Sequence, residues 1–227
     1  MIKFEYTSVM NLKNAFRGLR NPLNSWDKSD SFSDYFGPEG SERFIIGDND
    51  LALAQRLIKA GSDHRKFMRQ IFVSVDITAP LYWWKEFDTY KVATVANSCS
   101  TMHKIHDKEL TLADFSTDHL FNGVERCEFD NDDMEYYENP TTCLEYTIKV
   151  LNYYREKYLA TNNKEYWYQI IQLLPSSYNQ RRTVTLNYET IRAIRHSDRR
   201  NHKLDEWRIG FMEWIDSLPY ADELIKI

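Results

Sequence analysis

Residues 71–77 alternate between apolar side chains and other side chains with a period of two. The apolar positions are Ile71, Val73, Val75 and Ile77, and Ala79-Pro80 follows them. This period is typical of a β-strand with one buried face. The chain must therefore build a sheet, and the segments on either side of the strand decide what covers that face.

Most other apolar residues recur three or four positions apart, which is helical spacing. This spacing predicts helices over residues 9–19, 48–61, 81–106, 144–158, 166–174 and 205–218. Asp48 or Asp50 can cap the second helix, and Gly61 can end it. We therefore predict one mixed, helix-rich domain over residues 1–227.

Three segments fit neither period clearly. Residues 21–42 are rich in Asn, Ser, Asp, Pro and Gly, and we expect a long loop that is either functional or disordered. Residues 121–142 carry seven carboxylates and are expected to be a solvated acidic excursion, because the glycine and ligand spacing of a calcium loop are absent. Thr183 to Asn187 fits a short strand or the start of a helix.

Length and composition exclude several classes of protein. A chain of 227 residues with 42% hydrophobic residues can bury its own core. Its apolar runs are far shorter than the roughly 20 residues that span a membrane, and the N-terminus lacks the apolar core of a signal peptide. The three cysteines form no CxxC pair, so neither a disulfide framework nor a metal site is indicated. These features predict a cytoplasmic protein that does not contact a membrane.

Glycine is scarce, with only 7 residues, and no GxGxxG or GxxxxGK[ST] string occurs. Side chains rather than a glycine-rich backbone loop would therefore have to hold a nucleotide. Residues 180–208 contain eight basic and four acidic side chains, a local net charge of +4 in a chain of net charge −5. Their arginines could hold an anion, or they could form an ordinary solvated helix face. The overall negative charge argues against a nucleic acid as partner.

Two further groups of residues could carry function. His103 and His106 are three positions apart and could bind a metal, but no motif supplies a third ligand, so a polar helix face is the alternative. The aromatic residues between positions 82 and 87 could stack on a flavin or a base, although aromatic residues at helical spacing are more often core.

Two separated segments together resemble the flavin-dependent thymidylate synthases. The first, from Leu53 to His103, contains YKVATVANSCSTM at residues 90–102, which is similar to the family signature RHRxxSxNxxSxR. Asn97 and Ser100 match that signature.

The second segment is similar to the C-terminal half of the same family. It contains Arg181, Thr185-x-Asn187 and Arg200, with Trp207 seven positions after Arg200. Matching Arg200 requires a short insertion after Asn187. Together the two segments cover most of residues 50–210.

The resemblance implies an α+β fold in which helices pack around a mainly antiparallel sheet, and a homotetramer whose sites are shared between subunits. It implies that reduced FAD helps to carry a one-carbon unit from methylenetetrahydrofolate to C5 of dUMP, with NADPH as the reductant. The expected ligands are therefore a pyrimidine nucleotide and FAD.

The resemblance also assigns roles to six side chains by their positions. Ser100, Arg181 and Arg200 would bind the nucleotide. Arg200 would also be catalytic, because it would stabilise negative charge that develops on the pyrimidine carbonyl. The cofactor-binding positions would be Lys91, Asn97 and Asn187.

The chain departs from the family at its basic positions. The first three positions of the signature are Tyr90, Lys91 and Val92, its final phosphate-binding arginine is Met102, and the basic position after Asn187 is Glu189. Each charged hydrogen bond lost costs about 1.5 to 3 kcal/mol, so Lys91, His103 or Arg182 would have to substitute. Two hypotheses follow: a diverged enzyme, or a non-catalytic relative that binds an anionic ligand or a protein partner.

Overall fold

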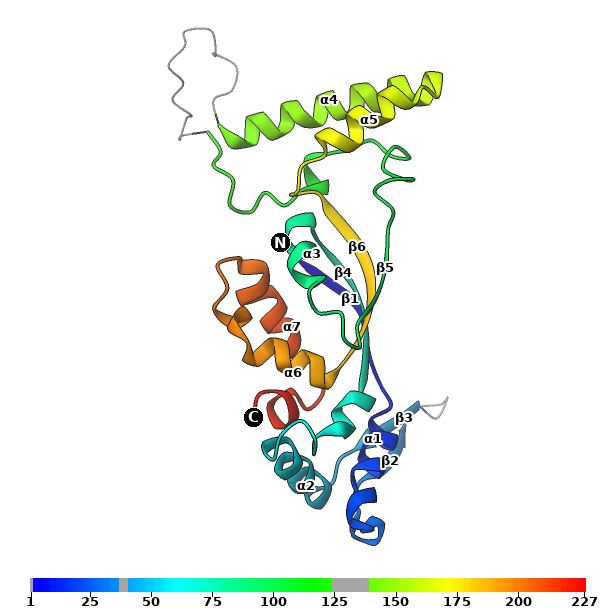
Figure 1. The fold of residues 1–227 in the computed structure, drawn as a ribbon, viewed down its shortest axis with the longest axis vertical. Helices are drawn as coiled ribbons and strands as arrows, with labels where there is room; N and C mark the ends of the chain where they lie inside the picture. Colours follow the sequence, from blue (N-terminus) through cyan, green and yellow to red (C-terminus); the bar gives the residue numbers. More distant parts are fainter. Residues whose placement is uncertain (1, 37–40, 124–138) are drawn as a thin grey trace. The chain divides into compact units, whose positions relative to one another are not determined.

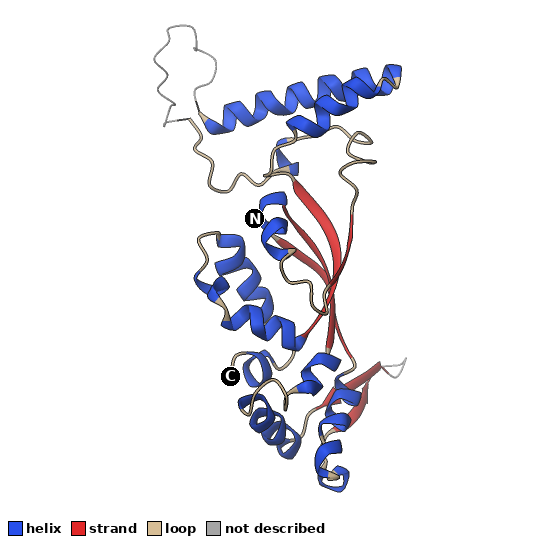
Figure 2. Cartoon of the chain, viewed as in Figure 1, coloured by secondary structure: helices blue, strands red, loops and turns tan. Residues whose placement is uncertain are grey.

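The computed structural model describes residues 2–36, 41–123 and 139–227 (Figures 1 and 2). Its larger sheet has four strands in the order β1 (Lys3–Met10), β4 (Phe72–Pro80), β6 (Asn179–Asn187) and β5 (Val95–Ser98). A separate antiparallel hairpin pairs β2 (Phe32–Phe36) with β3 (Ser41–Ile45). The α-helices are α1 (Leu12–Leu19), α2 (Asp48–Lys59), α3 (Leu81–Phe87), α4 (Pro140–Thr161), α5 (Lys164–Leu173), α6 (Tyr188–His196) and α7 (Met212–Asp216). The expected α+β class, helices with an antiparallel sheet, is confirmed.

The chain divides into two compact units. Unit 1 comprises residues 1–2, 78–88 and 98–182, and unit 2 comprises residues 3–77, 89–97 and 183–227. The boundary falls inside β4, β5 and β6, so each unit holds part of the four-stranded sheet. The single domain expected over residues 1–227 stays a prediction.

The core of unit 2 forms on one face of β4. Ile71, Val73, Val75 and Ile77 are each at most 1% exposed, as their alternation predicts. Helices α1 and α6 bury Ala15, Phe16, Leu19, Tyr188, Ile191 and Ile194. Burial of apolar area, at about 25 cal/mol per Å², is the main term that stabilises such a core.

Helix α2 begins at Asp48 as predicted, but neither Asp48 nor Asp50 caps it. The carboxylate of Asp30 instead accepts hydrogen bonds from the backbone N–H groups of Asn49 (2.8 Å) and Asp50 (3.0 Å). A residue distant in sequence therefore satisfies the helix N-terminus. The Asp50 side chain is buried and accepts a hydrogen bond from Arg20 Nε at 2.6 Å.

Two sequence predictions are wrong in part. Residues 21–42 are not one long loop, because they contain two short 3-10 turns, strand β2 and the start of β3. The helix predicted over residues 81–106 ends at Phe87, and the chain then turns and continues as β5. Val92 and Val95, which extend the apolar pattern, are 84% and 71% exposed, so they form no buried helix face.

The remaining predicted elements are present with shifted limits. The helix expected over residues 9–19 begins at Leu12, because the preceding residues form β1. Thr183 to Asn187 is the last part of β6, and α6 follows it directly. The helix expected over residues 205–218 is a π-helix over Glu206–Phe211 that continues into α7.

Unit 1 contains the helical hairpin of α4 and α5, which covers the helices predicted over residues 144–158 and 166–174 (Figure 1). Its core cluster consists of Ile105, Leu110, Phe115, Leu144, Ile148, Leu151 and Ile170. Asn152 on α4 fixes the preceding loop, since its side chain donates to the carbonyl of Leu110 (2.8 Å) and accepts from its N–H (2.9 Å).

Helix α3 lies in unit 1, and its aromatic residues belong to the core. Trp83, Trp84 and Phe87 are at most 2% exposed and pack ring against ring. Trp84 Nε1 donates to the carbonyl of Gln180 at 2.9 Å. These side chains are core, as aromatic residues at helical spacing usually are, and they offer no open face to a ligand.

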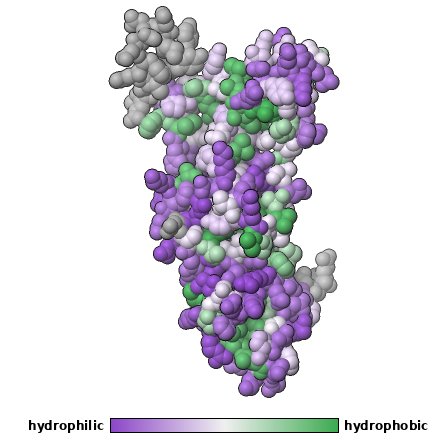
Figure 3. Space-filling model, in the orientation of Figure 1, coloured by the Kyte–Doolittle hydropathy of each residue, from purple (hydrophilic) through white to green (hydrophobic). Residues whose placement is uncertain are grey.

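The visible surface in Figure 3 is mostly polar, with apolar side chains in separate groups. In the described part of the chain, no helix has the length and apolarity that a membrane crossing requires. Residues 124–138 of the expected acidic excursion lie outside the described residues.

Candidate functional site

The signature-like segment, residues 90–102, contains a turn, the short strand β5 and a second turn. Residues 90–97 belong to unit 2 and residues 98–102 to unit 1. The six predicted site residues divide in the same way. Lys91, Asn97, Asn187 and Arg200 belong to unit 2, and Ser100 and Arg181 belong to unit 1.

In unit 2, Tyr90 interacts with Arg199 rather than with the predicted Arg200. Arg199 Nε donates to Tyr90 Oη at 2.8 Å. The Arg199 guanidinium carbon lies 5.6 Å from the centroid of the Tyr90 ring and 4.9 Å from that of Trp207. Because a guanidinium is attracted to aromatic faces, these two rings and the hydrogen bond together hold Arg199 in place.

Arg200 follows in the same 3-10 turn, Asp198–Asn201, and is exposed. It forms no hydrogen bond or ion pair with the described residues, so its guanidinium keeps its donors for an anion. The side chains of Lys91 and Asn97 are also exposed and make no such bond within the described ranges. Unit 2 therefore presents three polar side chains at predicted positions.

Asn187 is 2% exposed and stands at the junction of β6 and α6. Its Oδ1 accepts a hydrogen bond from the backbone N–H of Thr190 at 2.9 Å, so Asn187 is the N-cap of α6. Its Nδ2 donates to none of the described residues. The structural role of Asn187 thus uses the side-chain oxygen and leaves the amide hydrogens for a ligand.

Glu189, at the basic position of the family, is paired inside unit 2. Arg65 Nε lies 2.8 and 3.0 Å from the two carboxylate oxygens of Glu189. Arg192 lies nearby, and its Nη2 donates to the carbonyl of Ile227 at 2.6 Å. Burial and the charge of Arg65 lower the pKa of Arg192, whereas Glu189 acts in the opposite direction. The carboxylate of Glu189 therefore has its counter-charge within the chain.

In unit 1, the structure brings Ser100 and Arg181 onto adjoining lengths of backbone. The N–H of Cys99 donates to the carbonyl of Arg181 at 2.9 Å, and Gln180 Nε2 donates to the carbonyl of Cys99 at 2.7 Å. Ser100 Oγ accepts a hydrogen bond from the N–H of His103 at 2.9 Å and so shapes the turn after β5. Two predicted nucleotide-binding residues that are far apart in sequence are therefore neighbours in the fold.

Arg182, one of the possible substitutes for the missing arginines, is already engaged. Its Nη1 lies 2.8 Å from Asp88 Oδ1, and its Nε donates to Gln180 Oε1 at 2.9 Å. Its guanidinium carbon lies 4.2 Å from the Trp84 ring centroid. These contacts fix Arg182 within unit 1, so Lys91 and His103 are the substitutes that remain available.

A cavity of about 380 Å³ adjoins the turn that Ser100 shapes, and it lies within unit 1. Its lining residues are Met102, His103, His106, Tyr158, Asn162, Lys164 and Trp167. Trp167 Nε1 donates to the carbonyl of Met102 at 3.0 Å, which joins α5 to the signature-like segment. Lys164 carries positive charge, and two aromatic side chains supply apolar surface. The cavity therefore combines a cation with apolar surface.

His103 and His106, the possible metal pair, both line this cavity. The rings of His106 and Tyr158 pack edge to face with centroids 4.9 Å apart, and His106 Nδ1 is buried with no hydrogen-bond partner among the described residues. No three His, Cys, Asp or Glu side chains within the described ranges are placed to hold a metal ion. The two histidines are better described as a polar wall of the cavity.

Three residues of these groups were not singled out as site residues from the sequence. Arg199 lies in the basic segment 180–208 next to Arg200, and the ring contacts and the hydrogen bond to Tyr90 distinguish it from Arg200. Lys164 and Trp167 lie on an ordinary amphipathic helix, and their spacing from Met102 in the sequence gives no sign that they share a cavity with it.

No family model matches the sequence, and no curated protein matches it. Solved structures do match. One is thymidylate synthase X from Helicobacter pylori with FAD and dUMP, with 14% identity and a TM-score of 0.64 over 99% of this chain and 96% of that chain. Another is a UMP/dUMP methylase, PolB, from Streptomyces cacaoi bound with 5-Br dUMP, with 13% identity and a TM-score of 0.58 over 100% of this chain and 95% of that chain. These likenesses show the fold: the chain is similar to flavin-dependent thymidylate synthases in its architecture.

Proposed function

We propose that this chain binds a pyrimidine nucleotide of the dUMP type together with FAD, and transfers a one-carbon unit to C5 of the pyrimidine. The observation that carries the proposal is the backbone pairing that makes Ser100 and Arg181 neighbours in unit 1. The similar fold of structures that contain FAD and dUMP supports it. Methylenetetrahydrofolate would be the one-carbon donor and NADPH the reductant.

The nucleotide would be held by side chains in place of a glycine-rich loop. A guanidinium matches two phosphate oxygens at once, and a serine hydroxyl adds a third hydrogen bond. Arg181 and Ser100 would act in this way. Because Met102 supplies no charge, His103 would have to contribute beside it, and Lys164 in the adjoining cavity would add positive charge.

Three donors of unit 2 would bind the flavin cofactor. Lys91, Asn97 and Nδ2 of Asn187, which bonds to none of the described residues, offer hydrogen bonds suited to the carbonyl groups of the flavin ring and to the phosphates of FAD. When bound, FAD would supply the reducing equivalents for the transfer. Arg200 would lie at the pyrimidine carbonyl and stabilise the negative charge that develops there. We propose a homo-oligomer, a tetramer by resemblance, as the functional form.

Three measurements test this function. The purified protein should be yellow with a flavin absorbance spectrum, and calorimetry should detect dUMP binding. Ser100→Ala and Arg181→Gln should each weaken dUMP affinity, whereas Lys59→Gln, an exposed position on α2, should not. The chain should also support growth of a thymidine auxotroph. A colourless protein that binds neither FAD nor any pyrimidine nucleotide would refute the proposal.

A second function is favoured by the Arg65–Glu189 pair and by Met102. Glu189 and Met102 stand at two positions where the family has cationic residues. Their presence is consistent with a non-catalytic relative that binds an anionic ligand or a protein partner through the same fold. Binding of dUMP without growth of the auxotroph, and without turnover in the presence of FAD, folate and NADPH, would support this alternative. Growth of the auxotroph would exclude it.

A further inference from the structure

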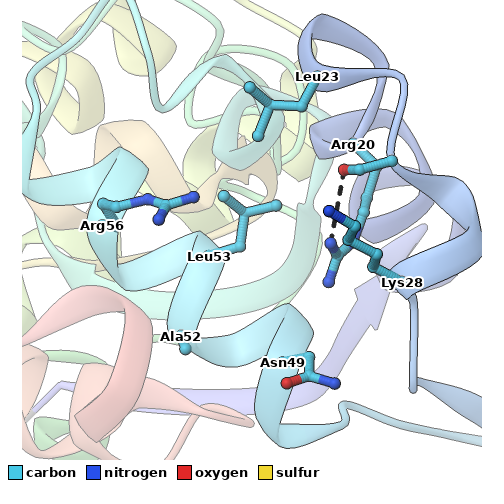
Figure 4. A pocket seen from close by; sticks show the side chains of 8 residues that line it. Arg20, Leu23, Lys28, Asn49, Ala52, Leu53 and Arg56 are labelled. Atoms are coloured by element: carbon cyan, nitrogen blue, oxygen red, sulfur yellow. Dashed lines mark hydrogen bonds between the residues drawn. The ribbon is translucent and has the colours of Figure 1, made fainter.

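Unit 2 contains a cavity of about 610 Å³ beside helix α2, and none of the predicted site residues lines it (Figure 4). Pockets that hold small molecules have volumes of roughly 300 to 1,000 Å³. The walls carry three cations, Arg20, Lys28 and Arg56, and no carboxylate among the described lining residues. Figure 4 shows Arg20 and Lys28 on one flank of the cavity and Arg56 on the other, with Leu53 between them.

Arg20 is the most buried of these three cations, with only 5% of its surface exposed. Its Nε donates to Asp50 Oδ1 at 2.6 Å, and its Nη1 lies 3.5 Å from Ser25 Oγ, which is long for a hydrogen bond. Its Nη2 is buried and has no hydrogen-bond partner among the described residues. A guanidinium buried in this way is incompletely satisfied by the described chain.

The charges around the cavity select the kind of acceptor. Asp50 already accepts hydrogen bonds from the hydroxyls of Ser29 and Ser31 at 2.6 Å each, and it neutralises one positive charge. Asp30 supplies a second carboxylate, which accepts hydrogen bonds from the backbone N–H groups of Asn49 and Asp50, so three cations and two carboxylates leave a net charge of +1. A phosphate monoester has three terminal oxygens and can accept from three cations at once, whereas a carboxylate has only two oxygens. The apolar side chains of Leu23 and Leu53 line the same space.

We propose that this cavity binds a small organic phosphate, a monoester with an apolar or aromatic body. The phosphate oxygens accept hydrogen bonds from Arg20, Lys28 and Arg56, and the body packs on Leu23 and Leu53. The site is separate from the proposed nucleotide site, because no residue of the two sets is shared.

Calorimetry with phenyl phosphate as the probe tests the proposal, with benzoate and benzyl alcohol as matched compounds of lower charge. Lys28 and Arg56 are exposed, so the double variant Lys28→Gln/Arg56→Gln should fold normally. It should weaken phenyl phosphate binding by at least about tenfold, the effect of losing one charged hydrogen bond. Lys59→Gln removes a charge from the same helix outside the cavity and should leave the affinity within about twofold.

Arg20→Lys provides a second measurement, because lysine can keep the ion pair with Asp50 but cannot reproduce the guanidinium fork. It should weaken phenyl phosphate binding, again with Lys59→Gln as the control. The proposal is overturned if phenyl phosphate shows no saturable binding, if benzoate binds as tightly as phenyl phosphate, or if the double variant binds phenyl phosphate like the unmodified chain.

Discussion

Arg199 donates a hydrogen bond to the hydroxyl of Tyr90 across a sequence separation of 109 residues, with an Nε to Oη distance of 2.8 Å. The contact joins the first position of the signature-like segment to the turn that carries Arg200. Tyr90 stands at a position that is basic in the family signature, and in this chain its hydroxyl binds Arg199. The pair leaves Arg200 as the exposed guanidinium of this turn.

Tyr90→Phe should lower the free energy of unfolding by about 1.5 to 3 kcal/mol, because it removes an acceptor from a charged donor and keeps the ring. Chemical denaturation measures this change. Tyr168→Phe is the matched control, since the Tyr168 hydroxyl makes no hydrogen bond with the described residues and should change stability by less than about 0.5 kcal/mol. Equal effects in the two variants would contradict the role given to the hydroxyl.

Met102→Arg should strengthen dUMP binding by about tenfold, because it adds one charged hydrogen bond at the position of the family's phosphate-binding arginine. Met102 is 48% exposed, and Trp167 bonds only to its backbone carbonyl, so an arginine can be accommodated. Calorimetry with dUMP gives the affinity. Met102→Gln, of similar length but uncharged, should have little effect, and an equal gain in both variants would count against a phosphate at this place.

Asn187→Ala and Asn187→Ser separate the two uses of this side chain. Alanine removes the cap of α6 and should lower the free energy of unfolding by about 1 kcal/mol, whereas serine keeps a capping oxygen and most of that stability. Both variants lack Nδ2 and should bind FAD more weakly. Thermal unfolding and flavin titration measure the two effects, and normal FAD affinity in Asn187→Ser would show that the residue serves only as a cap.

The Arg65–Glu189 pair should be detectable as a coupling between the two side chains. Glu189→Arg alone places like charges together and should lower stability, and the exchange Arg65→Glu/Glu189→Arg should recover part of the loss. Denaturation of the single and double variants gives the coupling energy, which should be about 1 to 3 kcal/mol for two contacting residues. Additive effects would mean that the 2.8 Å contact contributes nothing to stability.

Asp50→Asn should lower the free energy of unfolding by about 3 to 5 kcal/mol near neutral pH, because the buried Arg20 would lose its counter-charge. Burial by itself would raise the pKa of Asp50, but hydrogen bonds from Ser29, Ser31 and Arg20 outweigh it and lower the pKa below its ordinary value of 3.8. A carboxyl whose pKa is lower in the folded state stabilises the fold above its unfolded pKa and loses that effect as the pH falls through the folded pKa.

The stability difference between the unmodified chain and Asp50→Asn should therefore be constant above about pH 5 and shrink below about pH 4. Urea denaturation over a range of pH measures it. Asp34→Asn is the control, because Asp34 is exposed and forms no ion pair with the described residues. A difference that grows as the pH falls would contradict the sign derived for Asp50.

Elements with a strict apolar period were predictable from the sequence. The buried face of β4 and the helices α2, α4 and α5 follow from local spacing, because each element buries one face and the period reports which one. The helix predicted through residues 88–106 failed because Val92 and Val95 are apolar but exposed, and periodicity cannot tell exposed apolar residues from buried ones. The β2–β3 hairpin was missed because its strands are short and largely exposed, so they leave no buried-face pattern.

The sequence by itself determined the α+β class, the buried face of β4 and the positions at which polar side chains resemble those of flavin-dependent thymidylate synthases. Only the tertiary structure decided which of them meet. It brought Ser100 beside Arg181 through the backbone bond of Cys99 to Arg181, bonded Tyr90 to Arg199 and Glu189 to Arg65, and placed Arg20, Lys28 and Arg56 around one cavity. The reason is physical: secondary structure follows from neighbours three or four positions apart, whereas these contacts join residues brought together only when the sheet and helices pack.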